Sequence, residues 1–455
     1  MAASITSGIS TNTSTGLGNG IDVAQFVQLA LAGDQAVITN LQNSQNTLNS
    51  QSQALSKITT DFQALESAAF TLRDPLGALS SQTTQSSDSS VVSAVAASSA
   101  LAGSHTITVS NLATTSSFYS DALAASSTPL ASGSFQISAG GTQVASIIID
   151  STNNTLDKLA AAINNQTNQV RASVINDANG ARLALVSTTS GAPGNLAVTG
   201  NITAADTNST VVKFHQAVAG VNAALTVDGV PISSTSNTVT GAINGVTLNL
   251  GSPSPDTPVT VTVNPDTSKA TDAINQFVAA YNTVVKDINT QFTVNSDGTA
   301  NGPLEGDGSL RQAQSSLLSA AVFSVTGNNG IVNLASLGVN LNNDGTLTVD
   351  DSALSSALSS NYSAVQNFLQ STTNGFAQNF SNAITSITDP GTGVLTLDAN
   401  GISQSAQSIG QRISDLQAAL LVRQQQLTQV YAQVNTTLQQ LPLLQNQLSQ
   451  QLASA

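Results

Sequence analysis

The sequence contains no cysteine, no tryptophan, one methionine and two histidines among 455 residues. Without cysteine the chain forms neither disulfides nor thiolate metal sites. Charge is also scarce, because only 8% of the residues are Asp, Glu, Lys or Arg, against about 25% in an ordinary globular protein. Ser, Thr, Asn and Gln supply the polarity instead. Such a surface suits packing against neighbours, since burying an amide or a hydroxyl costs less than burying a charge.

Positive charge and long hydrophobic runs are missing as well. The 11 Lys and Arg are outnumbered by 25 Asp and Glu, for a formal net charge of −14. Affinity for phosphate backbones and anionic lipids needs clustered cations, and here they are scattered. No run reaches the roughly 20 apolar residues that a membrane helix requires. We therefore expect no nucleic-acid partner and no membrane insertion.

The N-terminal segment has no secretion signal of the cleaved kind. Met1-Ala2-Ala3-Ser4-Ile5-Thr6 lacks a basic region and an apolar region. Taken alone this favours a cytoplasmic protein, although an exporter that reads no cleaved signal stays open. Residues 1–20 are rich in Ser, Thr, Asn and Gly, and we expect them to be disordered.

Heptad patterns at both ends of the chain predict two long helices. Asp22 is the expected N-cap of the first, with Gln25 three positions on, and Pro75 and Gly77 end it. One heptad position is held in turn by Leu41, Leu48, Leu55 and Phe62 near the N-terminus, and by Ile413, Leu420, Leu427, Val434, Leu441 and Leu448 near the C-terminus. Leu416, Val430 and Leu444 hold the complementary position in the second pattern.

Two interpretations of these patterns remain open. Each is either an amphipathic core helix or one strand of a coiled coil, and the second pattern is about 40 residues long, beyond the usual 8–20, which favours the coiled coil. Pro442 is expected to kink or end the second helix.

Between these ends, residues 90–267 have the alternating pattern of β-strands. Turn signals are dense: Gly140-Gly141, Asn179-Gly180, Asp228-Gly229 and Asn244-Gly245. One short helix is expected around Leu156 to Ile163, and the helical period returns after Pro265. We therefore predict an α+β multidomain fold, in which paired long N- and C-terminal helices, a coiled-coil or helical-bundle stalk, carry inserted antiparallel β-rich domains.

The predicted domains are nested and discontinuous. We expect a disordered or helical terminal leg region at 1–40 with 415–455, a helical stalk domain with a β-hairpin at 41–88 with 268–414, a β-rich domain at 89–120 with 216–267, and an inserted β-rich domain with one short helix at 121–215.

Residues for catalysis or cofactor binding are few. His105 and His215 are the only histidines, and no motif places a base beside a nucleophile. The glycines from Gly16 to Gly20 lack the preceding strand of a dinucleotide site, so they indicate a linker. We expect no enzyme and no cofactor.

One segment imitates a calcium loop. Asn340, Asn342, Asp344, Gly345 and Asp351 take positions 1, 3, 5, 6 and 12 of an EF-hand-like loop. However, position 1 is Asn, position 12 is not Glu, and the following residues alternate like a strand. A hairpin turn is the favoured interpretation, and no metal site is expected.

Several segments follow one another in a distinctive order. They are Asn19-Gly20-Ile21-Asp22-Val23; residues 103–113; the run from Leu156 through Ile175-Asn176-Asp177 to Arg182-Leu183; Phe277-Val278-Ala279-Ala280-Tyr281-Asn282; Gly302-Pro303-Leu304-Glu305-Gly306-Asp307 with Leu310-Arg311; and Leu337-Gly338-Val339 followed by Asp344-Gly345-Thr346-Leu347. In order and spacing they resemble the flagellar hook-associated protein 2 (filament cap, FliD) family. The third run also resembles a repeat found in some flagellins. The match covers nearly the whole chain from residue 16.

The resemblance implies a structural role outside the cell. It implies a bacterial flagellar cap protein, exported through the flagellar type III apparatus with an export chaperone. It implies a homo-oligomeric ring, a pentamer, on the filament tip, whose terminal helices contact the filament end and whose β domains form a plate under which flagellin folds and inserts. The ten heptad residues above are then the contacts to other subunits or to the filament. The alternatives are a flagellin-like or hook–filament junction protein, and a β-rich surface adhesin.

Overall fold

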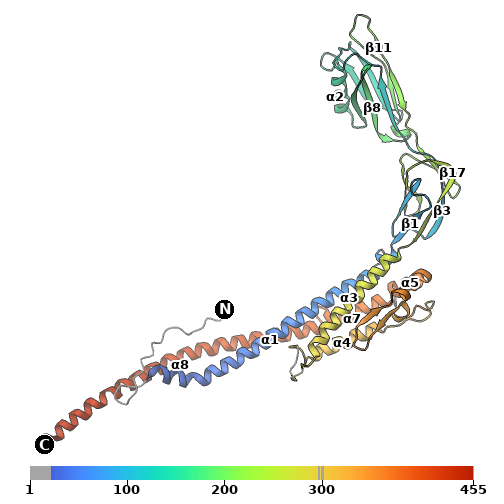
Figure 1. Ribbon diagram of the computed structural model, residues 1–455. Helices are drawn as coiled ribbons and strands as arrows, with labels where there is room; N and C mark the ends of the chain where they lie inside the picture. Colours follow the sequence, from blue (N-terminus) through green and yellow to red (C-terminus); the bar gives the residue numbers. More distant parts are fainter. Residues whose placement is uncertain (1–21, 296–297, 299–301, 454–455) are drawn as a thin grey trace. The chain divides into compact units, whose positions relative to one another are not determined.

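The computed structural model describes residues 22–295, 298 and 302–453 (Figure 1). The chain forms two compact units, one of residues 1–73 with 274–455 and the other of residues 74–273. The first is helical and the second is built of strands, so the β unit is inserted between the two ends of the helical unit. The α+β fold with paired terminal helices and inserted antiparallel sheets is thus confirmed.

The helical unit is organised around two long helices that lie side by side (Figure 1). Its elements are α1 (Val23–Arg73), α3 (Thr267–Phe292, which begins in the β unit), α4 (Gly308–Ala321), η3 (Ala335–Leu337), β18 (Val339–Leu341), β19 (Leu347–Val349), α5 (Asp351–Ser360), α6 (Tyr362–Gln370), α7 (Phe376–Thr388) and α8 (Val394–Ala453). The predicted N-cap is present, because the Gln25 N–H donates to Asp22 Oδ1 at 3.1 Å. Helix α1 ends at Arg73, just before Asp74-Pro75, where proline stops a helix.

Helices α1 and α8 run antiparallel, and three contacts define their register. The rings of Phe26 and Tyr431 lie 5.8 Å apart, Arg423 Nη1 donates to Asp34 Oδ2 at 2.8 Å, and Gln45 Nε2 donates to the Ala406 carbonyl at 3.3 Å. From the first contact to the third, the residue number in α1 rises from 26 to 45 while the residue number in α8 falls from 431 to 406. The two heptad patterns found in the sequence therefore belong to one antiparallel helix pair.

Part of the core of the helical unit is aromatic. Phe277 of α3 packs edge-on against Phe376 and Phe380 of α7, with centroid distances of 5.6 and 5.0 Å. Phe368 of α6 stacks on Phe376, and Tyr281 adds a fifth buried ring. Aromatic contacts of this kind stabilise a fold beyond the apolar area that they bury. This cluster fixes α3, α6 and α7 to one another.

The β unit has two hydrophobic cores. Its elements are η1 (Ala78–Ser80), β1 (Gln82–Ser86), β2 (Val92–Ala96), β3 (Gly103–Asn111), β4 (Thr115–Ser120), β5 (Gly133–Ala139), β6 (Thr142–Ile149), α2 (Leu156–Gln166), β7 (Val170–Asp177), β8 (Gly180–Ser190), η2 (Ala192–Gly194), β9 (Leu196–Thr199), β10 (Ile202–Thr203), β11 (Val211–Val212), β12 (Phe214–Val218), β13 (Ala223–Val227), β14 (Val230–Ser234), β15 (Thr238–Ile243), β16 (Val246–Leu250) and β17 (Ser254–Pro265). One core lies between residues 123 and 212, and the other joins residues 91–113 to residues 223–263.

Each core is bounded by antiparallel sheets. The first lies under the sheets β12-β4-β8-β7 and β6-β5-β9, and the second under β1-β17-β3-β13-β14 and β15-β16-β2. The four turns predicted from glycine pairs and Asn/Asp-Gly pairs all join adjacent antiparallel strands. Gly245 shows why glycine is needed, since its φ is +72° and a Cβ there would lie 2.7 Å from the Ala100 nitrogen.

Side chains of helix α2 hydrogen-bond to the edge strands of two sheets. The side chain of Asn164 pairs with both the N–H and the carbonyl of Ala172 on edge strand β7, each at 2.8 Å. Gln166 Nε2 donates to the Ser146 carbonyl on edge strand β6 at 3.1 Å. These side-chain amides bond to backbone groups of the edge strands that could otherwise pair with another strand.

Candidate functional site

The ten heptad residues predicted as contacts differ widely in burial. Leu55 and Phe62 are fully buried and Ile413 is nearly so, while Leu41, Leu48, Leu420 and Leu427 are half-buried. Towards the end of α8 the exposed fraction rises, from 43% at Val434 and 46% at Leu441 to 61% at Leu448. The heptad face is thus covered along part of α8 and uncovered beyond it.

The register of the helix pair explains this gradient. Because Phe26 lies opposite Tyr431, the first residue of α1, Val23, lies opposite α8 near residue 434. Helix α8 continues to Ala453. Its last roughly 19 residues, about 28 Å of helix at 1.5 Å per residue, have no described residue of α1 opposite them.

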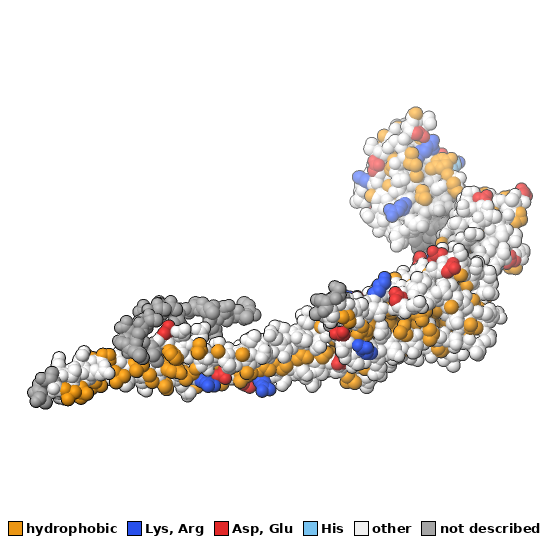
Figure 2. All heavy atoms as spheres, turned by 60° about the horizontal axis from the view of Figure 1, so that its bottom comes forward, with side chains coloured by type: hydrophobic (Ala, Val, Ile, Leu, Met, Phe, Trp, Pro, Cys, Tyr) orange, Lys and Arg blue, Asp and Glu red, His pale blue; other side chains and the backbone are white. Residues whose placement is uncertain are grey.

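The uncovered part of α8 carries an apolar stripe. Leu441, Leu444, Leu448 and Leu452 recur at intervals of three or four residues, so they share one helix face. At 100° per residue Leu443 lies on the opposite face. Figure 2 shows apolar side chains along the outer part of this helix. We call these four leucines the α8 stripe.

Charge is absent around the α8 stripe. From Gln424 to the last residue of the chain no residue is charged, and glutamine is the main polar residue. An isolated helix with an apolar stripe is normally kept in solution by charged residues on its other faces. The composition therefore matches a helix face that is covered by another protein surface.

Pro442 lies inside the stripe but does not end the helix. Helix α8 runs from Val394 to Ala453, so the expectation that the proline ends it is wrong. Proline lacks only one N–H, which would otherwise bond to the carbonyl of Leu438, and it clashes locally with the preceding turn. The helical bonds on both sides continue past this single defect.

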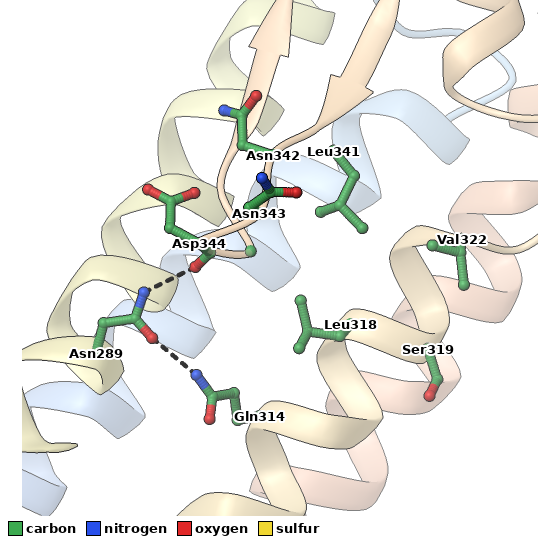
Figure 3. Close-up of a pocket in the computed structure, with 10 residues that line it drawn as sticks. Asn289, Gln314, Leu318, Ser319, Val322, Leu341, Asn342, Asn343 and Asp344 are labelled. Carbon is green, nitrogen blue, oxygen red and sulfur yellow. Dashed lines mark hydrogen bonds between the residues drawn. The ribbon is translucent and has the colours of Figure 1, made fainter.

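The EF-hand-like segment is a hairpin, as the sequence favoured. Asn340 lies in β18, which pairs with β19, and Asp344 Oδ1 accepts from the N–H and the hydroxyl of Thr346 at 3.0 and 2.6 Å. Beside the turn lies a shallow groove of about 610 Å³, where Asn289 donates to the Asp344 carbonyl and accepts from Gln314 (Figure 3). Within the described ranges no group of three or more His, Asp or Glu side chains is arranged to hold a metal.

The two histidines are surface residues of the β unit. His105 Nδ1 lies 2.8 Å from Asp228 Oδ2, and His215 Nε2 lies 2.8 Å from Asp121 Oδ1. The hydrogen bond with His105 and a second one from the Thr106 N–H lower the pKa of Asp228. The hydrogen bond from the Lys213 N–H and the one with His215 lower the pKa of Asp121. Within the described part of the chain, the hydrogen bond recorded for each histidine side chain is to an aspartate and not to a nucleophile.

Two carboxyl contacts lie within the helical unit. Lys57 of α1 bridges Asp61, at 3.1 Å, and Asp287 of α3. On α8, burial and the neighbouring carboxyl of Asp307 raise the pKa of Asp398 to about 6. Both contacts join different helices, so they serve the packing of the helical unit.

Two models of one protein family match the chain. They are "Flagellar hook-associated protein 2 N-terminus", over residues 19–116, and "Flagellar hook-associated protein 2 C-terminus", over residues 220–442. Together they span well over half of the sequence. The chain belongs to the flagellar hook-associated protein 2 family.

Individual relatives and a solved structure agree with this membership. The B-type flagellar hook-associated protein 2 of Pseudomonas aeruginosa is 29% identical over 397 residues, which are 82% of this chain and 83% of that protein. The flagellar hook-associated protein 2 of Escherichia coli is 27% identical over 380 residues, 78% of this chain and 79% of that protein. The crystal structure of the flagellar cap protein FliD D1-D2-D3 domains from Escherichia coli has a TM-score of 0.59 and 29% identity, covering 77% of this chain and 99% of that one.

The sequence-based prediction named most of the α8 stripe, and the contact role of these residues stays a prediction. The heptad positions identified Leu441, Leu444 and Leu448, whereas Leu452 was not singled out, because it departs from the seven-residue spacing. A count at helical spacing of three or four residues would have included it.

Proposed function

We propose that this chain is the cap at the tip of the bacterial flagellar filament, where it forms a homo-oligomeric ring and promotes the folding and insertion of exported flagellin. Membership of the hook-associated protein 2 family is the main support. The protein then acts outside the cell at the filament tip, and flagellin and further copies of itself are its partners. Its role is structural rather than enzymatic.

The observation that carries the mechanism is the uncovered α8 stripe. A helix that leaves four leucines exposed, with no charge around them, gains stability when another surface buries them. The six heptad residues of α8 form one face that is buried within the chain near Ile413 and uncovered near Leu448. The uncovered end is the part that contacts the filament end or a neighbouring subunit.

The finer features of the proposal follow the family resemblance. The ring is a pentamer, and the chain reaches the outside through the flagellar type III export apparatus with the help of an export chaperone. The terminal leg region comprises 1–40 with 415–455, of which residues 1–21 lie outside the described part of the chain. The absence of cysteine and the low charge are compatible with this route.

Electron microscopy of the purified full-length chain tests the assembly. A cap should form small closed rings, whereas a flagellin-like or junction protein should polymerise into filaments or stay monomeric alone. Removal of residues 415–455 should leave a folded β unit that no longer supports filament growth in cells. Normal filaments with this truncated chain as the only copy, at matched expression, would rule out the leg mechanism.

A further inference from the structure

Seven Asn-Gly pairs occur in the sequence, and each is a place where the chain can modify itself without an enzyme. The backbone nitrogen of the glycine can attack the side-chain carbonyl carbon of the asparagine, since glycine has no side chain that blocks the approach. Five of the pairs lie within the residues that the structure describes: Asn179-Gly180, Asn244-Gly245, Asn329-Gly330, Asn374-Gly375 and Asn400-Gly401. Their surroundings decide which of them reacts.

The attack makes two demands on the local structure. The glycine N–H has to be free of a hydrogen bond, because the nitrogen loses its proton as it forms the new bond. The peptide plane between the two residues has to rotate until the nitrogen faces the asparagine Cγ, so the glycine needs open space around it. A pair that fails either demand is protected while the chain is folded.

The pair Asn329-Gly330 meets both demands. It forms the tip of a turn in which the Ile331 N–H donates to the Asn328 carbonyl at 2.9 Å. The φ angles of Asn329 and Gly330 are +45° and +85°, as in a type I′ turn, where the N–H of the second central residue takes no part in the closing bond. Among the described residues, none accepts a hydrogen bond from the Gly330 N–H. Asn329 is exposed and a Cβ added at Gly330 would meet no atom within 4 Å, so this peptide has room to rotate.

The base of the same turn is fixed. Asn328 Nδ2 donates to the Ile331 carbonyl at 2.9 Å and to the Ala364 carbonyl of α6 at 2.7 Å. Below the tip, the Val325 N–H donates to the Val332 carbonyl at 2.8 Å, and Ile331 is buried. The tip can therefore rotate while the rest of the turn stays attached to the helical unit.

Two of the other pairs lack a free glycine N–H. The Gly375 N–H donates to the Ser371 carbonyl at 2.9 Å. Gly401 lies inside α8, where each backbone N–H bonds to the carbonyl four residues earlier. Attack at either pair first requires a backbone hydrogen bond to break, which lowers the fraction of molecules that can react.

The remaining two pairs lack open space. Gly180 pairs with Asp177 across a hairpin, and a Cβ there would lie 2.1 Å from the Leu123 carbonyl oxygen. Gly245 lies against Ala100, as described above, and its carbonyl accepts from the Ala97 N–H at 2.8 Å. Neither glycine can move unless its neighbours move with it.

We propose that Asn329 is the residue at which the folded chain deamidates spontaneously, ahead of the other four described pairs. The Gly330 nitrogen forms a bond to Asn329 Cγ and gives up its proton, and the bond from Cγ to the side-chain nitrogen breaks, so that ammonia leaves and a succinimide ring remains. Water then opens the ring. Attack at Cγ gives aspartate, and attack at the backbone carbonyl gives isoaspartate, in which the chain runs through the former side chain.

The product changes the turn in two ways. Each modified copy gains a carboxylate at the exposed tip. In the isoaspartate form the backbone is also longer by one methylene group, between Asn328 and Ile331, whose hydrogen bond closes the turn. Because ammonia is lost and the amide does not form again, modified copies accumulate as the protein ages. This inference does not depend on the cap function.

Peptide mapping by mass spectrometry tests the proposal on the purified full-length chain. Samples are aged in mildly alkaline buffer, folded and in urea, and each Asn-Gly peptide is followed for its conversion to the acid, with isoaspartate detected by enzymatic methylation. In the folded chain Asn329 should convert at least about fivefold faster than Asn374, the factor that breaking one backbone hydrogen bond implies. In urea the five pairs should convert at similar rates, because the hydrogen bonds and the packing are gone.

A pair of matched variants assigns the reaction to its residue. Asn329→Gln should abolish conversion at this turn, because the longer side chain would have to close a larger ring, whereas Asn374→Gln should leave conversion at Asn329 unchanged. Conversion at Asn329 that is no faster than at Asn374 in the folded chain would overturn the proposal. The same preference for Asn329 in urea would overturn it as well, since the sequence and not the fold would then set the rate. Both of these results come from the unaltered chain, so they hold even where a variant fails to fold.

Discussion

Replacing the α8 stripe by alanine should abolish capping without unfolding the protein. The change is Leu441→Ala with Leu444→Ala and Leu448→Ala, whose side chains are 46, 57 and 61% exposed in the free chain. Alanine is the best helix former, so α8 persists. Because about half of each of these side chains is already exposed in the free chain, the free energy of unfolding should change by less than about 1 kcal/mol.

The effect on assembly follows from the area still to be buried. Full burial of a leucine contributes about 1.5–3 kcal/mol, and about half of each side chain remains exposed, so the three together contribute about 2–5 kcal/mol per subunit on assembly. At about 1.4 kcal/mol per factor of ten, the affinity for the filament end falls by roughly 30-fold to 3,000-fold. Filament length in cells carrying the variant, and binding of the purified chain to filament ends, measure this loss.

The matched control changes leucines on the opposite helix face. Leu421→Ala with Leu443→Ala removes side chains of similar exposure, 51 and 65%, and should leave filaments normal. Normal filaments with the stripe variant, or equal loss with the control, would refute the reasoning that the stripe is the contact face.

Three further changes test the structure of the helical unit. Leu55→Ala, at a fully buried position, should lower the free energy of unfolding by about 2–5 kcal/mol in thermal or denaturant melts, and a loss below 1 kcal/mol would contradict its burial against another helix. The folded-state pKa of Asp398 is raised to about 6 from an ordinary 3.8, so the folded chain binds more protons and its stability falls as the pH rises from about 4 to 6. Asp398→Asn should therefore stabilise the chain at pH 7, by at most about 1 kcal/mol after solvent screening, and should flatten that pH dependence; an unchanged dependence would refute the assignment. Saturating calcium should leave the melting temperature unchanged, because Asp344 is engaged by Thr346, and a calcium shift that Asp344→Ala abolishes would contradict the hairpin.

The sequence predicted the helices and turns well because their signals are local. The N-cap at Asp22, the short helix α2 and the glycine turns depend on residues a few positions apart, and each lies where expected. The heptads predicted which face of each terminal helix is apolar. The heptads did not predict the residue of α8 at which packing against α1 ends. That residue depends on the register between two segments that are almost 400 residues apart in the sequence.

Contacts between distant segments could not be predicted in the same way. The order of strands in the sheets joins β1 to β17 and β3 to β13, and no local pattern specifies such pairs. The aromatic cluster of Phe277, Phe376 and Phe380 likewise combines α3 and α7, which are far apart in the sequence. Likewise, Arg171 is placed beside Val186 only when β7 and β8 pair.

The fate of exported flagellin in cells that lack this chain tests the cap function most directly. Flagellin is measured separately in filaments and in the culture medium, in cells without the gene and in the same cells with the full-length gene restored. The account predicts that flagellin is still exported but is released unpolymerised, with short or absent filaments, and that the full-length gene restores them. Filaments of normal length in cells without the gene would contradict the cap function.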